Sequence, residues 1–303
     1  MTATIPLSAP VRGRPAPAAV LELLKPVTWF APMWAFSCGL VSASSAGEAG
    51  WLTIATGVLL CGPLVCGTSQ AVNDWFDRHV DAINEPNRPI PSGRIPGQWG
   101  LIIAIVWTCV SLSVAAMLGR FVFAPALFGM ACAWAYSAPP LRLKRNGWVG
   151  NMAVGMCYEG LPWITGAAVM SGGLPTWQVF TLAGLYSLGA HGIMTLNDFK
   201  SIEGDRKMGL DSLPAVMGEE VAALLACVVM AGPQVIVITL LSLWGHPAYA
   251  AGVAILLAVQ IVLMRRLLAA PCERAPWYNA TGTTLYVLGM LVSAFALKAG
   301  VGS

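Results

Sequence analysis

The feature that most constrains this chain is a series of nine long apolar blocks. Each is about 20 residues long, enough for a helix to cross the hydrocarbon core of a bilayer. Backbone groups in lipid must bond within their own segment, so the blocks predict helices rather than strands. Charged residues make up 10% of the sequence, against about 25% in a soluble domain. The predicted spans are residues 27–46, 51–72, 99–118, 121–138, 149–169, 176–197, 221–244, 247–267 and 279–299.

These blocks predict an all-α integral membrane protein, a bundle of nine transmembrane helices. Residues 1–24 form an N-terminal segment that is rich in Pro and Ala and lacks the apolar core of a cleaved secretory signal. We expect a short surface helix around residues 18–25 and a single transmembrane domain over residues 25–303. The eight cysteines form no CxxC or Cys/His pattern, so we interpret them as small buried apolar side chains.

The basic residues indicate which side of the membrane each loop occupies. If the nine spans alternate in direction, 15 of the 17 Lys and Arg residues fall on the side that holds the N-terminus. Only Arg120 and Lys298 fall on the other side. Because Lys and Arg concentrate in cytoplasmic loops, the N-terminus is predicted to be cytoplasmic, and the active site with it.

The acidic residues gather in two islands on this same side. Eight of the 14 acidic residues lie in residues 73–85 and 198–211, each at the cytoplasmic end of a predicted span. Both islands begin with Asn-Asp, in VNDWFD at 72–77 and in LNDFKS at 196–201. This similarity suggests a weak internal repeat.

The spacing within the islands indicates cation binding. On a helix, Asn73, Asp77 and Asp81 lie on one face because they are four residues apart. In the second island, Asp198 and Asp205 are predicted to share one helical face in the same way. Crowded carboxylates repel each other unless a cation lies between them, and Mg²⁺ suits such oxygen ligands together with substrate phosphates. The alternative is that both islands are ordinary solvated loops.

Basic side chains accompany both islands and suit phosphate groups. The stretch RPIPSGR at 88–94 predicts an ordered turn between two arginines. Carboxylates repel a diphosphate unless metal ions lie between them, so both signs of charge are needed around one ligand. The candidate diphosphate-binding residues are Arg88, Arg94, Arg142, Lys144, Lys200 and Arg206.

The two islands resemble the motifs of a known family. The pattern NDxxDxxxD at 73–81, with a second Asp-rich motif after the sixth span, resembles the UbiA-type intramembrane prenyltransferases, and the resemblance covers nearly the whole chain. That family has nine transmembrane helices and two such motifs at corresponding places. The strings similar to its chlorophyll and bacteriochlorophyll synthase branch are LLKPVTWFAPMWAF at 23–36, NDWFDRHVDAINEPNRPIPSGRIP at 73–96, YSAPPLRLKRNGWVGN at 136–151 and NDFKSIEGDRKMGLDSLP at 197–214. CYEGLPW at 157–163 favours the bacteriochlorophyll side of that branch.

The resemblance implies an enzyme that esterifies the propionate of bacteriochlorophyllide a with geranylgeranyl or phytyl diphosphate and releases pyrophosphate, to form bacteriochlorophyll a. It implies two Mg²⁺ ions bound with the diphosphate. The implied catalytic residues are Asn73, Asp77, Asp81, Asp198, Glu203 and Asp205, and the implied metal ligands are the same residues without Glu203. Many relatives have Asp where this chain has Ser201, so a direct role of Ser201 in metal binding stays open.

Other acceptors and another class of protein stay as alternatives. The same fold and motifs serve a chlorophyll synthase acting on chlorophyllide, or an enzyme acting on an aromatic quinone precursor. A transporter would place charges near the bilayer midplane, whereas the acids here concentrate at one surface. No GxxxxGK[ST] motif is present, and nucleic acid is not an expected partner. The resemblance also implies a bacterial cytoplasmic or intracytoplasmic photosynthetic membrane, and association with pigment-biosynthesis or photosystem-assembly proteins.

Four residues are candidate pigment contacts. Glu159 is a lone acid in the fifth span, where an ionised carboxylate costs roughly 2.5–3.5 kcal/mol. The alternative for Glu159 is a neutral structural role near a helix break at 160–162. His191 is a candidate ligand for the magnesium of the tetrapyrrole, or an interhelical histidine. Trp29 and Trp34 either line a pigment pocket or anchor the helix ends at the membrane interface.

Overall fold

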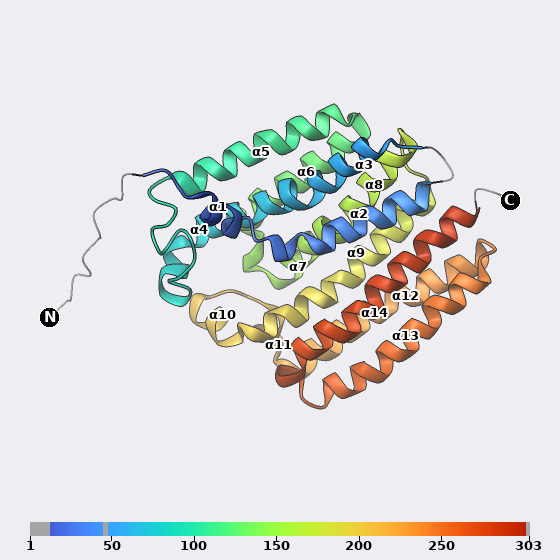
Figure 1. Ribbon diagram of the computed structural model, residues 1–303. Coiled ribbons are helices and arrows are strands. Elements are labelled where there is room, and N and C mark those ends of the chain that lie inside the picture. Colours follow the sequence, from blue (N-terminus) through green and yellow to red (C-terminus); the bar gives the residue numbers. More distant parts are fainter. Residues whose placement is uncertain (1–12, 45–47, 301–303) are drawn as a thin grey trace.

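The computed structural model describes residues 13–44 and 48–300. This part of the chain is helical almost throughout, and its only extended pairing is one parallel bridge between Asn146 and Asp211. The long helices run side by side as one bundle (Figure 1). Arg12 and residues 45–46 of the first predicted span lie outside the described residues.

Helices occupy each of the nine predicted spans over the described residues. The helical segments are α2 (Phe30–Ala43), the continuous run α3 (Trp51–Leu59), η2 (Leu60–Cys66) and α4 (Gly67–Asn84), α5 (Trp99–Met117), α6 (Arg120–Ser137), the run α7 (Gly147–Gly155), η4 (Met156–Gly160) and α8 (Leu161–Ser171), α9 (Trp177–Asn197), α12 (Glu219–Leu243), α13 (Pro247–Leu268) and α14 (Pro271–Gly300). Six of them are long and apolar enough to cross a membrane: the α3–α4 run, α5, α9, α12, α13 and α14. The all-α membrane class is confirmed, and the count of nine crossings stays a prediction.

Two boundaries differ from the prediction. The second helix continues past residue 72 to Asn84, so the first island is part of a long helix. The fifth helix does not break at residues 160–162, because a π-helical segment, η4, carries the chain through to α8. A second π-helical segment, η2, interrupts the α3–α4 run. Such segments are rare and frequently lie at functional sites.

The second island is not one helix, so the prediction that Asp198 and Asp205 share a single helical face was wrong. Helix α9 ends at Asn197, a 3₁₀ turn η5 (Asp198–Lys200) follows, and α10 (Ile202–Met208) starts after Ser201. Ser201 has φ −121° and ψ 8°, outside the helical region. Its hydroxyl lies 3.1 Å from the Asp198 carbonyl oxygen, and such a local bond competes with the helical pattern.

Small residues bring the helices of the bundle close together. Helices α2 and α8 cross at two glycines: a Cβ built on Gly39 would lie 2.0 Å from the Trp163 carbonyl oxygen, and one built on Gly166 would lie 2.0 Å from the Phe36 carbonyl oxygen. The largest core cluster joins these helices to α9, α12, α13 and α14. Small residues at helix contacts are typical of membrane bundles, where backbone approach replaces hydrophobic burial as the driving force.

The short elements gather at one end of the bundle (Figure 1). They are α1 (Pro17–Leu23), η1 (Pro26–Thr28), η3 (Leu143–Arg145), η5, α10 and α11 (Leu213–Met217). Helix α1 confirms the predicted short helix before the first span. The Asn146–Asp211 bridge ties the segment before α7 to the segment before α11. Both acidic islands therefore lie at the end where the loops are longest.

Candidate active site

The first island divides into two charged clusters on α4. Asp74 is 1% exposed and binds the Lys25 ammonium at 2.6 Å. Arg88 lies 2.8 Å from an oxygen of Asp81 and 3.5 Å from an oxygen of Asp74. Asp74 and Asp77 pair with different cations, so they point to different sides of α4. Asp81 lies instead on the Asp74 side of the helix, because residues seven apart are nearly aligned.

Asp77 lies in the second cluster. The Lys144 ammonium is within hydrogen-bond distance of both its carboxylate oxygens, and Arg142 approaches one of them at 3.7 Å. The Asn73 amide donates to Asp77 at 3.1 Å and also lies 3.2 Å from the Ser137 hydroxyl. Two predicted phosphate-binding residues and two predicted metal ligands therefore meet at one point.

The charge of Lys144 depends on this pairing. Its side chain is 10% exposed, and burial lowers the pKa of the ammonium from its ordinary value, while the nearby Asp77 charge opposes that effect. Lys144 lies on η3, whose preceding residue Arg142 has a left-handed backbone with φ 39°. The tight turn after α6 thus brings both basic side chains back over α4.

The second island faces the first across a cavity of about 300 Å³. Asn73 lines this cavity from α4, and Asp198, Lys200 and Ser201 line it from η5 and the turn after it. Asp205 is buried and accepts a hydrogen bond from the Ser201 hydroxyl at 3.0 Å. The remaining lining residues are Ser69, Gln70, Cys132, Ala133, Tyr136, Asn151, Ala153, Val154, Cys157, Tyr158, Met194 and Asn197.

Among the polar residues of this cavity that were not singled out from the sequence, two lie against the acidic residues. Asn151 donates to Asp198 at 3.1 Å and so fixes that carboxylate. Tyr136 lines the cavity where the charges of Asp198, Asp77 and Asp205 all act on it. Both residues were inside the quoted string at 136–151, at its first and last positions, but neither carries charge or follows a repeat.

The donor set around the cavity suits Mg²⁺. The Asp198 carboxylate and the Asn73 and Asn151 amides line it, and the carboxylates of Asp77 and Asp205 are hydrogen-bonded to lining residues, so hard oxygen ligands gather there. Over residues 13–44 and 48–300, no three Asp, Glu, His or Cys side chains are close enough together to form a metal centre by themselves. Mg²⁺ fits such an arrangement because it usually binds one or two carboxylates together with substrate phosphates and waters.

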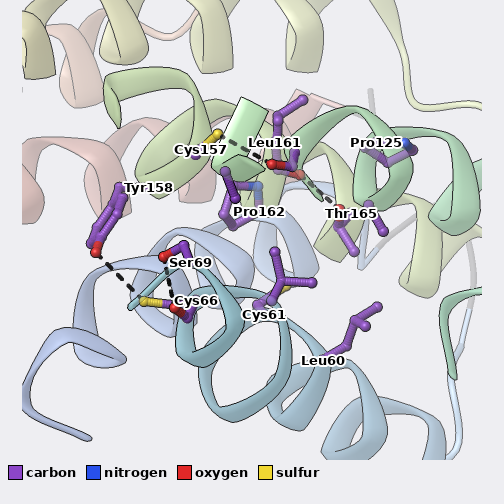
Figure 2. Close-up of a pocket in the computed structure, with 14 residues that line it drawn as sticks. Leu60, Cys61, Cys66, Ser69, Pro125, Cys157, Tyr158, Leu161, Pro162 and Thr165 are labelled. Atoms are coloured by element: carbon purple, nitrogen blue, oxygen red, sulfur yellow. Dashed lines mark hydrogen bonds between the residues drawn. The ribbon is translucent and has the colours of Figure 1, made fainter. Parts of the chain in front are cut away.

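A narrow apolar slot adjoins this cavity inside the bundle (Figure 2). Its volume is about 40 Å³, and it shares Ser69, Ala133, Cys157 and Tyr158 with the larger cavity. Both π-helical segments line it, with Leu60, Cys61 and Cys66 from η2 and Cys157 and Tyr158 from η4. The Tyr158 hydroxyl accepts a hydrogen bond from the Gln70 amide at 3.0 Å and lies 3.6 Å from the Cys66 sulfur. The π-helical turns therefore shape the junction between a polar chamber and an apolar one.

Three predicted site residues lie elsewhere. Arg94 forms an exposed pair with Glu22 of α1 and also donates to the Asn87 carbonyl. Its hydrogen bond lowers the pKa of the Glu22 carboxyl. Arg206 donates to the Ala215 carbonyl oxygen at 3.1 Å, and Glu203 is exposed on α10. None of the three is among the residues that line the cavity.

The four candidate pigment contacts also have distinct positions. Trp29 donates to the Leu24 carbonyl at 2.8 Å, and Trp34 donates to the Val287 carbonyl at 3.0 Å, so both indoles take part in packing within the chain. Glu159 is buried in η4, and its Oε2 has no hydrogen-bond partner in the described part of the chain. His191 is buried on α9 beside Trp148.

The helical bundle, the two Asn-Asp motifs and the adjoining cavity define an intramembrane prenyltransferase. Residues 32–288 match the UbiA prenyltransferase family, and the chain belongs to that family. The chain is a multi-pass integral membrane protein and an enzyme of this class.

Particular relatives narrow the class. The chain is 57% identical to the bacteriochlorophyll synthase 33 kDa chain of Cereibacter sphaeroides, over 97% of this chain and 98% of that protein. It is 55% identical to the protein of the same description from Rhodobacter capsulatus, over 96% and 97% of the two chains. It is 40% identical to the chloroplastic chlorophyll synthase of Arabidopsis thaliana, over 91% of this chain and 73% of that protein.

Solved structures share the fold. A digeranylgeranylglyceryl phosphate synthase structure is similar with a TM-score of 0.72 at 22% identity, over 92% of this chain and 98% of that chain. A UbiA homolog from Archaeoglobus fulgidus bound to GPP and Mg²⁺ is similar with a TM-score of 0.64 at 19% identity, over 94% and 98% of the two chains.

Proposed function

We propose that this protein esterifies the propionate of bacteriochlorophyllide a with geranylgeranyl or phytyl diphosphate and releases pyrophosphate. The observation that carries the proposal is the cavity in which residues of both Asn-Asp motifs face each other beside an apolar slot. A charged leaving group and an apolar chain on one substrate require such a pair of chambers. The 57% and 55% identity to bacteriochlorophyll synthase chains supports the choice of acceptor over chlorophyllide or a quinone precursor.

The diphosphate binds at the polar cavity, where Asn73, Asp77, Asp198 and Asp205 hold two Mg²⁺ ions with it. Bound Mg²⁺ neutralises the diphosphate and stabilises the charge that develops on the leaving pyrophosphate. The solved relative with GPP and Mg²⁺ supports this requirement. Asp81 lies one turn further along α4, where it pairs with Arg88, and it contributes to metal binding from that position.

Cationic side chains at the cavity then act on the phosphate oxygens. Lys144 and Arg142 lie over Asp77, and Lys200 lines the cavity from the second island. A fixed cation placed where negative charge develops stabilises the transition state more than the ground state.

The slot beside Tyr158 receives the first part of the isoprenoid chain. Its apolar walls exclude water from the reacting carbon, which protects an allylic cation from hydrolysis. The acceptor is a propionate, which is already ionised near neutral pH, so the reaction needs no strong general base. The bundle holds the two reactants close together, which supplies much of the rate acceleration.

The orientation in the membrane follows from the loop charges. We place the N-terminus and both islands on the cytoplasmic side of the bacterial cytoplasmic or photosynthetic membrane, where the soluble pyrophosphate is released. The gathering of the short elements at one end of the bundle supports this placement (Figure 1), since both acidic islands lie at that end. Association with pigment-biosynthesis or photosystem-assembly proteins is a further proposal, supported by the pigment that the protein would deliver.

Membranes that contain the protein test this function directly. Incubation with bacteriochlorophyllide a, geranylgeranyl diphosphate and Mg²⁺ is expected to give one pyrophosphate for each esterified pigment, and chelation of Mg²⁺ is expected to stop the reaction. Parallel samples contain chlorophyllide a or 4-hydroxybenzoate as acceptor, and membranes with Asp77→Asn serve as the control. Prenylation of the phenolic acid without any pigment ester would overturn the proposed acceptor.

A further inference from the structure

A second, wider groove opens on the flank of the bundle. It has a volume of about 430 Å³, and almost all of its lining is apolar. Its outer rim is exposed, with Trp148 50%, Val149 48% and Leu188 41% exposed, so the groove opens sideways where the bundle faces lipid. The other lining residues are Cys132, Leu143, Met152, Ala153, Met156, His191 and Val229, from α6, η3, α7, η4, α9 and α12.

His191 is the one ionisable side chain among the residues that line this groove, apart from the thiol of Cys132. It is only 2% exposed; the Trp148 backbone lies near its ring, but neither ring nitrogen completes a hydrogen bond within the described residues. A buried polar group left without a partner is costly, and such a group in a native protein calls for an explanation. A ligand that supplies the missing partner removes this cost.

Trp148 covers His191 at the rim. The two ring centroids are 5.4 Å apart at an interplanar angle of 35°. The Trp148 backbone is fixed, because its amide donates to the Asn146 side chain at 3.0 Å, but its half-exposed ring has room to turn outward. An outward turn uncovers the imidazole and leaves an indole face beside the groove.

The groove adjoins the reaction cavity. Cys132 of α6 and Ala153 of α7 line both spaces. Leu143, which lines the groove, belongs to η3, and η3 also carries Lys144 to Asp77. A ring system in the groove therefore lies beside the cavity that holds the diphosphate-binding residues, and the narrow slot adjoins the same cavity through other residues.

We infer that this groove binds the tetrapyrrole ring of the acceptor, with His191 as the axial ligand of its central magnesium and Trp148 against the ring face. A broad, apolar, laterally open groove suits a planar macrocycle, and a neutral imidazole nitrogen suits its metal. A lipid acyl chain or a second isoprenoid chain fits the apolar lining but gives His191 no partner. The inference rests on the proposed function and adds to it a binding site and a ligating residue.

Binding measurements on the purified protein test the inference. The probes are bacteriochlorophyllide a and its magnesium-free counterpart, each titrated while the absorption bands that respond to axial ligation are recorded. His191→Ala is expected to weaken binding of the magnesium form by about tenfold or more, to abolish the axial-ligation shift, and to leave binding of the magnesium-free form unchanged. An equal effect on both forms, or no effect on either, would overturn the role of His191.

Groove variants keep the test decisive if His191→Ala folds poorly. Leu188→Trp fills the exposed rim of the groove and is expected to weaken binding of both pigments by about tenfold. Val228→Trp is the matched control, because Val228 is exposed on α12 but does not line the groove. Unchanged pigment binding in Leu188→Trp would place the macrocycle elsewhere.

Donor binding separates this inference from the proposed function. Binding of geranylgeranyl diphosphate with Mg²⁺ is expected to be the same in Leu188→Trp and in the unchanged protein. If the unchanged protein esterifies bacteriochlorophyllide but neither variant alters pigment binding, only the inference fails. If the unchanged protein neither binds nor esterifies any tetrapyrrole, the proposed function fails with it.

Discussion

Asp77 is the residue at which the opposite charges of the site converge. Its carboxylate accepts hydrogen bonds from Lys144 and from the Asn73 amide, and Arg142 lies 3.7 Å away. We predict that Asp77→Asn lowers turnover by at least about 10²-fold, because a neutral amide neither holds Mg²⁺ well nor balances the two cations. Steady-state esterification at saturating substrate measures the effect.

Folding and metal-dependent donor binding accompany this measurement. Glu220→Gln is the control, since Glu220 is exposed at the start of α12 and does not line the cavity. Asp77→Asn is expected to elute as the unchanged protein does on size-exclusion chromatography and to lose Mg²⁺-dependent donor affinity. Retention of most of the activity would exclude metal binding at Asp77.

Lys144 gives the site a pH dependence on the alkaline side. Burial lowers its pKa, so the ammonium loses its proton at a lower pH than an exposed lysine does. Below that pKa, Lys144 is charged and donor affinity is full; as the pH rises through it, the affinity for the diphosphate falls. Lys144→Arg stays protonated throughout and is expected to move this fall to higher pH. Titration of donor affinity against pH checks the prediction, and identical profiles for the two proteins would contradict it.

Close helix crossings determine how the bundle positions these residues. Helices α2 and α8 meet where Gly39 and Gly166 each face a backbone carbonyl of the other helix, with room for hydrogen but not for a methyl group. We predict that Gly166→Ala destabilises the protein by about 1–3 kcal/mol or more, because the two backbones must move apart. Thermal unfolding in detergent measures the loss.

Gly232→Ala is the matched control at this scale. Gly232 lies within α12, and a Cβ built there meets nothing within 4 Å. Alanine has the higher helix propensity, so this variant is expected to be as stable as the unchanged protein or slightly more stable. Equal melting temperatures for Gly166→Ala and Gly232→Ala would show that the α2–α8 crossing tolerates separation.

The sequence predicted the long helices, whose positions depend on apolar length and charge. It did not predict the π-helical segments or the turn at Ser201, which depend on local geometry. Apolar blocks located α5, α9, α12 and α13 within a few residues of their ends. The π-helical segments η2 and η4 have no hydrophobic period of their own and were not predicted. The turn at Ser201 was missed because it depends on one side-chain hydrogen bond rather than on a repeating pattern.

At the scale of the whole molecule, the sequence predicted many of the residues that make up the site, but only part of their arrangement in space. The two Asn-Asp motifs predicted which elements meet, and Asn73, Asp198 and Lys200 do line one cavity. The pairing of Arg94 with Glu22 was not predictable, because it depends on how α1 docks on the turn after α4. Neutral side chains such as Asn151 and Tyr158 also gave no sequence signal, since their contribution lies in which partner they meet in space.

The position of the charged loops at one end of the bundle also predicts how the bundle is oriented in the membrane. Helix α9 with the turn after it separates Thr176 from Glu203, and its 21 residues span about 30 Å, the thickness of the hydrocarbon core. Both residues are exposed. We predict that Glu203→Cys reacts with a membrane-impermeant maleimide in inverted membrane vesicles and not in intact spheroplasts, because basic loops stay in the cytoplasm.

Thr176→Cys is expected to show the opposite labelling pattern. Peptide mass mapping distinguishes the introduced cysteine from the eight native cysteines. If Thr176→Cys were labelled in inverted vesicles, the pyrophosphate would leave on the far side of the membrane, and the loop charges would not determine the orientation. If both sites were labelled from one side, α9 would not cross the membrane at all. The two variants together therefore test the crossing of α9 and its direction independently of catalysis.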